Sequence, residues 1–318
     1  MIILVALLMG LIIALLIVIK SADIFVDNLV EIGEALGVSQ IILGVTASAI
    51  GTSLAEFGSA MIAILTGSTD IGVGVVIGSN IWNIAGILGI SAFVAGSIQT
   101  NRREITRDGI MTLLTALILT VFMLFIDELT AIVGVVLISI YIIYFWVLLR
   151  SEKGNNENNS QKAKRDQISK KNLMKVVVGI AGLVVGARLL VYSSVEIANI
   201  LNIPQILIGL FALGIGTSMP ELVVTLTSAM KNLHSLSIGT VLGSNVFNIM
   251  IGLGVPALFM NIPIEPLSVS FDAPVMILVT SLLLIFAGRN MKLTRWDGLV
   301  LIAIYVIYIS TRIYISVL

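Results

Sequence analysis

Long apolar runs alternate with short polar borders along the whole chain. Ten of these runs are each long enough to cross a hydrocarbon layer roughly 30 Å thick as a helix. They lie near residues 2–20, 39–65, 71–98, 109–126, 130–149, 173–192, 205–230, 236–260, 273–288 and 297–316. The pattern predicts an all-α membrane protein with ten transmembrane helices.

Composition supports this interpretation. Of the 318 residues, 58% are hydrophobic and 11% are charged, and the formal net charge is zero. A neutral chain has no bulk attraction to nucleic acid, and the lack of cysteine excludes disulfides and thiolate metal sites. Nothing in the sequence calls for a cofactor or an obligatory protein partner.

The basic residues predict the orientation in the membrane. With ten spans, fifteen of the 18 Lys and Arg fall in loops on one side, while the loops of the other side carry only acidic residues. By the positive-inside rule the basic loops are cytoplasmic, so both termini are expected outside the cell membrane.

One polar stretch, residues 151–172, divides the chain into two similar halves. It is rich in Asn, Lys and Ser and is predicted to be a flexible cytoplasmic linker between residues 1–150 and 173–318. Each half holds five spans, and an odd number turns the second half upside down relative to the first. Inverted repeats of this kind are typical of transporters, which bind their substrate where the repeats meet.

A shift of 165 residues places residues 21–89 over 186–254 without a gap. The polar residues that match carry the candidate chemistry. In the first half they are Thr52, Ser53, Glu56, Ser79 and Asn83, and in the second half Thr217, Ser218, Glu221, Ser244 and Asn248. All fall near the middle of their runs, and their spacing within each run places them on one face of a helix.

A local structural role competes with this interpretation. The segments "SLAE" and "SMPE" fit a capping box, in which Ser53 or Ser218 caps a helix that begins after a break at Gly51 or Gly216. Pro220 suits a first helical turn. A neutral Gln could serve the same cap, however, and a carboxylate at the membrane centre is disfavoured by roughly 3 kcal/mol.

The expected ligand is a hard cation. Two carboxylates, hydroxyls and amides form an all-oxygen cage without imidazole or thiolate, which suits Ca²⁺ or Na⁺. One Ca²⁺, a few Na⁺ or two protons would each cancel the charge of two glutamates. Exchange is therefore expected rather than a leak. An intramembrane hydrolase is less well supported, because no His or second acid accompanies the motifs within a half.

The segments "GTSLAE" with "GSNIWNI" and "GTSMPEL" with "GSNVFNI" resemble the two alpha repeats of the cation/calcium exchanger superfamily, in its sodium/calcium exchanger branch. The resemblance implies an antiporter, not an enzyme, that exchanges three Na⁺ for one Ca²⁺ by alternating access. Two alternatives stay open, a Ca²⁺/H⁺ antiporter and a K⁺-dependent exchanger.

The resemblance also implies roles for individual residues. Glu56 and Glu221 would be the central Ca²⁺ ligands. Hydroxyl or carbonyl oxygens would come from the residues around them: Thr52, Ser53, Thr217, Ser218, Ser79, Ser244, Ala49 and Gly214. Asn83 and Asn248 would line the centre.

Five further residues carry separate expectations. Asn248 stands where K⁺-dependent relatives resemble one another in having Asp, which makes K⁺ transport less expected. Asn80 and Asn245 are expected to face away from the site and to bond between helices. Asp23 and its counterpart Arg188 lie on the helices expected to move and could form gating contacts.

Overall fold

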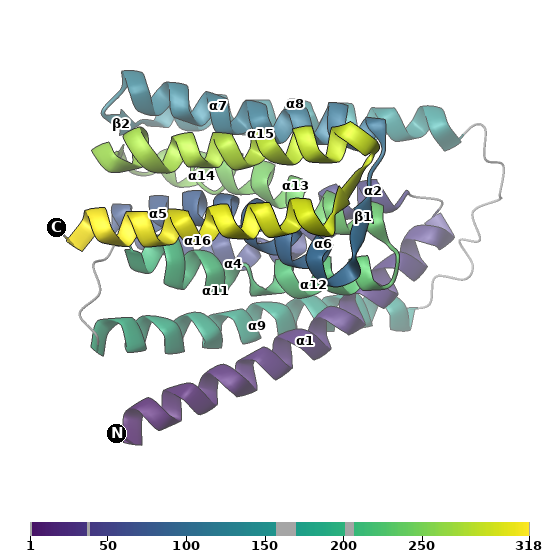
Figure 1. Cartoon of the computed structure of the whole chain (residues 1–318), viewed down its shortest axis with the longest axis horizontal. Helices are drawn as coiled ribbons and strands as arrows, with labels where there is room; N and C mark the ends of the chain where they lie inside the picture. Colours follow the sequence, from purple (N-terminus) through teal and green to yellow (C-terminus); the bar gives the residue numbers. More distant parts are fainter. Residues whose placement is uncertain (1, 37–38, 157–169, 201–206, 318) are drawn as a thin grey trace.

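The computed structural model describes residues 2–36, 39–156, 170–200 and 207–317. This part of the chain is a bundle of long helices that run side by side, with α1 inclined to the rest (Figure 1). The helices of the first half are α1 (Ile2–Leu36), α2 (Gln40–Leu43), α3 (Ala49–Thr52), α4 (Leu54–Leu65), α5 (Thr69–Ile81), α6 (Gly89–Ala95), α7 (Ile110–Phe125) and α8 (Ala131–Asn156). Those of the second half are α9 (Lys170–Ile200), α11 (Gly214–Thr217), α12 (Met219–Met230), α13 (His234–Met250), α14 (Gly254–Ala257), α15 (Ala273–Asn290) and α16 (Arg295–Val317). Wider π-helical turns join several of them: η1 (Gly44–Ser48), η2 (Trp82–Leu88), η3 (Glu104–Gly109), η5 (Ile208–Leu213) and η6 (Ser268–Asp272).

Six helical segments of the described residues are long and apolar enough to cross a membrane, and the bent pair around Ser53 would make a seventh. The six are Thr69–Ala95, Glu104–Phe125, Ala131–Arg150, His234–Ala257, Ser268–Asn290 and Arg295–Ser316. The chain is therefore a helical membrane protein. The count of ten spans stays a prediction.

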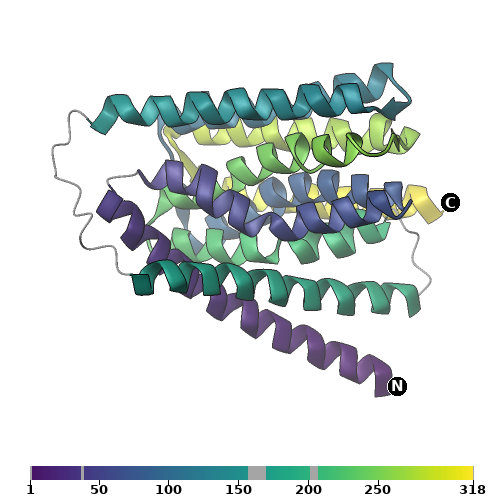
Figure 2. The ribbon, with the colours of Figure 1, turned by 180° about the vertical axis from the view of Figure 1, so that it is seen from behind.

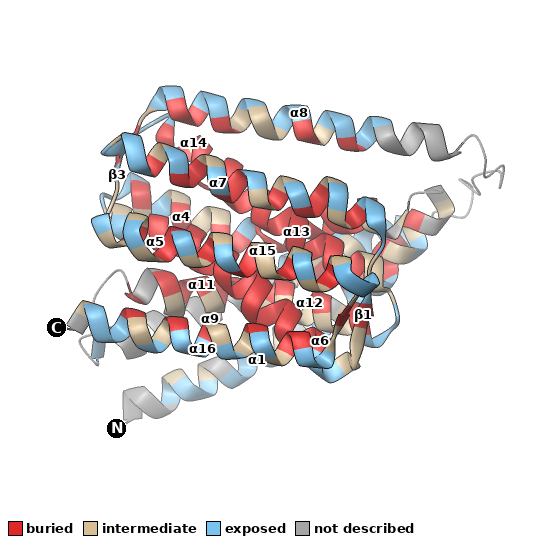
Figure 3. Ribbon diagram, turned by 45° about the horizontal axis from the view of Figure 1, so that its top comes forward, coloured by how far each residue is buried: buried red, intermediate tan, exposed pale blue. Residues whose placement is uncertain are grey.

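The helices that carry the two "GSN" segments form the centre of the bundle. Burial within the protein reaches 94% for the apolar window of Thr69–Ala95 and 89% for that of His234–Ala257, against 28% for Ala131–Arg150 and for Arg295–Ser316. Figure 3 shows α13 and α12 as buried, with exposed residues on the outer faces of α8, α15 and α16. The polar central helices are thus shielded on all sides by apolar ones.

Glycine allows this centre to pack closely. A Cβ at Gly78 would lie 2.2 Å from the Leu210 carbonyl oxygen, and one at Gly243 would lie 2.6 Å from that of Val45. Each glycine therefore lets α5 or α13 touch the backbone of the π-helical segment from the other half. Because a backbone atom cannot move aside as a side chain can, no larger residue fits at either position.

The helices that carry the two glutamates are interrupted just before them. The chain bends by 43° between the segments Ile41–Thr52 and Leu54–Leu65. In the second half α11 ends at Thr217 and α12 begins at Met219. The interruptions thus lie at Ser53 and Ser218, two residues beyond the glycines where the sequence placed them.

Two short antiparallel ladders join the halves at opposite ends of the bundle (Figure 1). Strand β1 (Ser97–Gln99) pairs with β4 (Lys292–Thr294), and β2 (Glu128–Leu129) pairs with β3 (Ile262–Pro263). The first and last described residues lie at the β2 end, and both views show α1 beside α9 on one flank (Figures 1 and 2). Which end faces the cytoplasm stays a prediction.

The predicted linker is shorter than the sequence indicated. Helix α8 continues to Asn156 and α9 begins at Lys170, so residues 151–156 and 170–172 are helical. The rest of the predicted linker, residues 157–169, lies outside the described part.

Candidate functional site

Two fully buried glutamates face each other across the halves. Glu56 lies in the first turn of α4 and Glu221 in the first turn of α12, and both are 0% exposed. Each carboxyl group is bonded by the serine that directly precedes the other glutamate's helix, so the two groups lie in one buried cluster. The structure thus brings together the acids that the sequence singled out.

Each carboxylate is held by a serine from the opposite half. Ser218 Oγ donates to Glu56 Oε1 at 2.7 Å, and Ser53 Oγ donates to Glu221 Oε1 at 2.8 Å. Neither serine caps its own helix with its side chain, so the capping-box interpretation was wrong. The interruptions in the helices instead place each hydroxyl beside the other half's acid.

A second reciprocal pair surrounds the carboxylates. Ser79 Oγ donates to the Gly214 carbonyl at 3.2 Å, and Ser244 Oγ lies 3.5 Å from the Ala49 carbonyl. Ser244 Oγ is also 3.4 Å from Glu221 Oε1. All are buried, and the contacts match between the halves as the repeat predicts.

The threonines of the two motifs bond within their own helices. Thr52 Oγ1 donates to the Ser48 carbonyl at 3.0 Å, and Thr217 Oγ1 donates to the Leu213 carbonyl at 2.7 Å. Both are buried. Because a hydroxyl that donates its proton keeps its lone pairs, both oxygens could still accept a cation.

The asparagines differ between the halves. Asn83 Nδ2 donates to Asn245 Oδ1 at 3.0 Å, and Asn245 Nδ2 donates to the Asn80 carbonyl at 3.0 Å. Asn245 therefore bonds between helices, as predicted, but it also contacts a candidate site residue rather than facing away. Asn80 donates to Val76 in its own helix. Neither amide atom of Asn248, which is 1% exposed, has a partner among the described residues.

Four buried oxygens of the candidate ligand residues have no hydrogen-bond partner within the described part of the chain. They are Glu56 Oε2, Glu221 Oε2, Asn83 Oδ1 and Asn248 Oδ1. Leaving a buried acceptor unpaired is costly, and such groups in native proteins call for a ligand, an ion or a water. These oxygens are the ligand type that a hard cation prefers, and the amide nitrogen of Asn248 also lacks a described partner.

The candidate site contains few charged side chains. Across the described residues no three His, Cys, Asp or Glu side chains gather where they could hold a metal ion. A cation here would rely on two carboxylates and on neutral oxygens.

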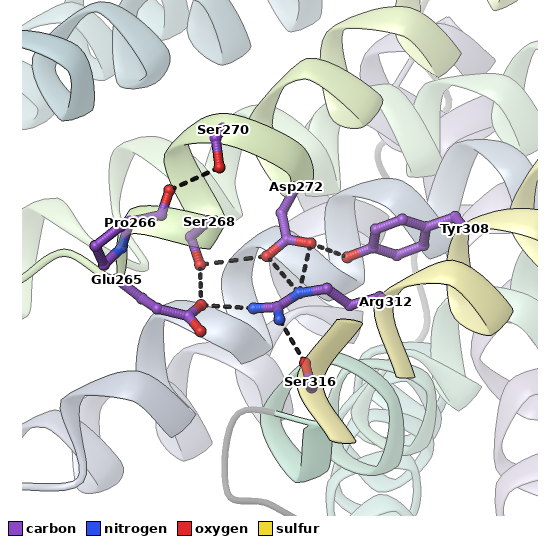
Figure 4. A network of polar contacts seen from close by, with 8 residues as sticks. All are labelled: Glu265, Pro266, Ser268, Ser270, Asp272, Tyr308, Arg312 and Ser316. Carbon is purple, nitrogen blue, oxygen red and sulfur yellow. Dashed lines mark hydrogen bonds and ion pairs between the residues drawn. The ribbon is translucent and has the colours of Figure 1, made fainter. Parts of the chain in front are cut away.

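The sequence did not predict a buried ionic network at the β2 end of the bundle. Arg312 is 0% exposed, and its Nε donates to Asp272 Oδ1 at 3.0 Å. Arg312 also pairs with Glu265, and Tyr308 Oη donates to Asp272 Oδ1 at 2.9 Å (Figure 4). The first half holds a matching pair, Tyr144 and Asp108, at 3.0 Å.

This network corrects the prediction that the acidic residues on the side without Lys or Arg lie in solvated loops. Asp272 is not solvated but fully buried, and the arginine that neutralises it comes from the last helix. The equal spacing of 36 residues in the two Asp–Tyr pairs is the signal that could have revealed it.

Of the two predicted gating residues, Asp23 has a described ionic neighbour. Lys231, just after α12, lies 2.6 Å from Asp27 and 3.9 Å from Asp23 on α1. The groups are 39% or more exposed, so the pairs are weak. A gating role for Asp23 and Arg188 stays a prediction.

The fold and the candidate site define a class, a helical membrane protein that encloses a buried cluster of carboxyl, hydroxyl and amide groups. The sequence profile of the family described as "Sodium/calcium exchanger protein" matches residues 6–150 and 171–314. The chain belongs to this family of membrane antiporters.

Individual relatives are similar over nearly their whole length. The sodium/calcium exchanger MaX1 of Methanosarcina acetivorans is 31% identical, over 96% of this chain and 98% of its own. The membrane protein MJ0091 of Methanocaldococcus jannaschii is 32% identical, over 92% and 93%. A solved structure of the sodium-calcium exchanger NCX_Mj superposes with a TM-score of 0.82 at 31% identity, over 96% and 98%.

Proposed function

We propose that the chain is a secondary active antiporter that exchanges Na⁺ for Ca²⁺ by alternating access. The observation that carries the proposal is the pair Glu56 and Glu221. Each buried carboxylate has one oxygen fixed by a serine of the opposite half and one oxygen without a described partner. Two such carboxylates in one buried cluster would be strongly unfavourable in the membrane unless cations neutralise them.

The donor set fits these two ions. Ca²⁺ takes six to eight oxygens in loose geometry, and carboxylates with carbonyls, amides and hydroxyls are its usual ligands. We assign the central Ca²⁺ ligands to Glu56 and Glu221, which Na⁺ would share. The surrounding oxygens would come from Thr52, Ser53, Ser79, Asn83, Thr217, Ser218, Ser244 and Asn248, and from the carbonyls of Ala49 and Gly214. The names of MaX1 and NCX_Mj support this pair of ions.

The proposed architecture has ten spans in two inverted repeats, with the second and seventh spans broken. Three observations support it. The serine–glutamate bonds are reciprocal. The helices are interrupted at the matching residues Ser53 and Ser218. The two ladders lie at opposite ends of the bundle, where a twofold axis in the membrane plane would place them (Figure 1).

The proposed stoichiometry is three Na⁺ for one Ca²⁺. Each cycle would then move one net charge, worth about 2.3 kcal/mol per 100 mV of membrane potential. Calcium transport should therefore respond to voltage.

The purified protein in liposomes tests the proposal. An outward Na⁺ gradient should drive Ca²⁺ uptake, and a membrane potential should change its rate. An outward proton gradient at the same voltage should not drive uptake. Uptake that is indifferent to Na⁺ would refute Na⁺/Ca²⁺ exchange.

A Ca²⁺/H⁺ antiporter is the second candidate. The same two carboxylates could each take a proton on the oxygen that has no described partner, so the geometry allows two protons to replace one Ca²⁺. The proton-gradient arm of the same experiment distinguishes it. Adding K⁺ to the Na⁺ arm tests the K⁺-dependent alternative, which Asn248 makes less expected because its amide carries no charge.

A further inference from the structure

Three buried hydroxyl groups lie to one side of the glutamate site without a hydrogen-bond partner among the described residues. Thr225 and Ser228 follow Glu221 by one and two turns along α12, and Ser91 lies in α6, which packs against α12. All three residues are 0% exposed. Their position, between the glutamates and one end of the bundle, suggests a function.

Other helical hydroxyls in the described structure behave differently. A serine or threonine in a helix usually donates to the carbonyl one turn back. Such bonds are made by Thr46, Thr112, Thr120, Thr217, Thr240 and Thr280. Thr225 and Ser228 make no such bond. A buried polar group left in this way is expected to serve a ligand or water.

The hydroxyls lead from the site toward one end of the bundle. Seven residues of helix separate Glu221 from Ser228, about 10 Å along the axis. Helix α12 ends four residues before His234, where α13 begins, and α6 ends just before strand β1. Both helices therefore run from the site toward the β1–β4 ladder and the basic loops, the predicted cytoplasmic side.

Helix α13 extends the same polar lining. Ser244 lies beside Glu221, and Thr240 and Ser237 follow at helical spacing toward the same end. Ser237 Oγ donates to the Thr225 carbonyl at 3.0 Å, which places α13 directly against this part of α12.

These five hydroxyl residues have no hydroxyl at the matching positions of the other half. The repeat shift that superposes the glutamates pairs the five hydroxyl residues with residues that have none. Thr225, Ser228, Ser237, Thr240 and Ser91 correspond to Ala60, Ala63, Gly72, Val75 and Pro256. In α4, the first-half counterpart of α12, alanine fills the two positions that match Thr225 and Ser228. Close packing alone therefore does not require hydroxyl side chains at these positions.

We infer that Ser91, Thr225 and Ser228 line the passage through which cations move between the glutamate site and the cytoplasmic side. Their hydroxyl oxygens replace part of the hydration shell of an ion in transit. The inference rests on the proposed exchange, and it makes the two access routes chemically unequal, because Ala60 and Ala63 stand in the first half where Thr225 and Ser228 stand in the second.

Cysteine labelling tests the passage. The chain has no cysteine, so single variants of the full-length protein carry one thiol each. We expect Thr225→Cys and Ser228→Cys to react with the cationic reagent methanethiosulfonate ethylammonium added from the β1–β4 side. Saturating Ca²⁺ should slow the reaction at least tenfold. The matched controls Ala60→Cys and Ala63→Cys should not react from that side.

Transport provides a second readout. Thr225→Val keeps the shape and removes the hydroxyl, and it should slow Na⁺-driven Ca²⁺ uptake at least tenfold while leaving the equilibrium Kd for Ca²⁺ unchanged. Thr225→Ser should restore the rate.

The inference is overturned if both thiols are unreactive, or react only from the opposite side, in protein that still exchanges Na⁺ for Ca²⁺. Wild-type transport by Thr225→Val would also overturn it. A wild-type protein without Na⁺-driven uptake would refute the proposed function instead, and the labelling would still report whether the passage exists.

Discussion

At the scale of the residue, the serine–glutamate bonds are the most informative contacts of the site. Ser53 and Ser218 each fix one oxygen of a carboxylate and leave the other oxygen without a described partner. A hydroxyl that donates to a carboxylate stabilises its charged form. The serines therefore both orient the glutamates and favour the charged form that the proposed cation binding requires.

Replacing a glutamate should remove transport without unfolding the protein. Glu221→Gln keeps the size and the hydrogen-bonding capacity but removes one of the two charges, so Ca²⁺ uptake into liposomes should fall below detection. Glu128→Gln, at an exposed position in β2, is the control and should transport normally. Normal Ca²⁺ flux in Glu221→Gln would place the site elsewhere.

Removing a serine hydroxyl should weaken binding. Ser218→Ala removes the hydrogen bond that orients Glu56 Oε1. The loss should weaken the binding free energy for Ca²⁺ by about 1–3 kcal/mol, which corresponds to a rise in Kd of roughly 5- to 150-fold. Ser53→Ala should act alike on Glu221. Calorimetry would measure both, with Ser139→Ala as the control, because its exposed hydroxyl bonds only to its own helix. Unchanged affinity in both site variants would show that the serines do not position the acids.

At the scale of the element, the site depends on how closely α5 and α13 approach the π-helical segments. Gly78 and Gly243 permit that approach and lie directly before Ser79 and Ser244. A displaced α5 or α13 would carry its serine away from the carbonyl that it contacts. Helix packing and the proposed ion binding are thus linked through two glycines.

Gly78→Ala should therefore disturb both folding and binding. The added Cβ would meet the Leu210 carbonyl oxygen at 2.2 Å, so we expect a loss of several degrees in the melting temperature and weaker Ca²⁺ binding. Gly58→Ala is the matched control, since its Cβ would meet nothing within 4 Å. Alanine should stabilise that helical position by up to about 1 kcal/mol. Equal melting temperatures for the two variants would contradict the packing argument.

At the scale of the whole molecule, two buried aspartates hold the outer helices together. Arg312 connects the last helix to Asp272 and Glu265, and in the first half Tyr144 Oη of α8 donates to Asp108 Oδ1 at 3.0 Å. Breaking such a pair strands a charge in a poorly polarisable environment.

Arg312→Met should cost about 3–5 kcal/mol of unfolding free energy, because it leaves Asp272 buried without its counter-charge. Adding Asp272→Asn and Glu265→Gln should recover part of the loss. Thermal unfolding in detergent measures both, and Arg289→Met, at a pair that is 61% exposed on the arginine side, should change stability by less than about 1 kcal/mol. A similar loss in both single variants would show that burial does not decide the effect.

The sequence predicted the membrane class, the repeat and the central acids because a charge within an apolar run has few explanations. It could not predict that Ser53 and Ser218 bond across the halves, since the same spacing fits a capping box within one helix. It also missed Arg312, because a lone arginine near the end of an apolar run usually extends to the membrane surface. The bonds of Ser53, Ser218 and Arg312 all join segments that are far apart in the sequence, and the sequence pattern alone does not show which distant segments meet.

The crossed serine–glutamate bonds have a consequence for the origin of the chain. A single half would hold one acid and a serine whose partner lies in another molecule, so alone it could not assemble the cage. Two identical copies in opposite orientations would complete it, each lending its hydroxyl to its neighbour. Duplication and fusion of an ancestral gene would have made permanent a partnership that began between separate subunits.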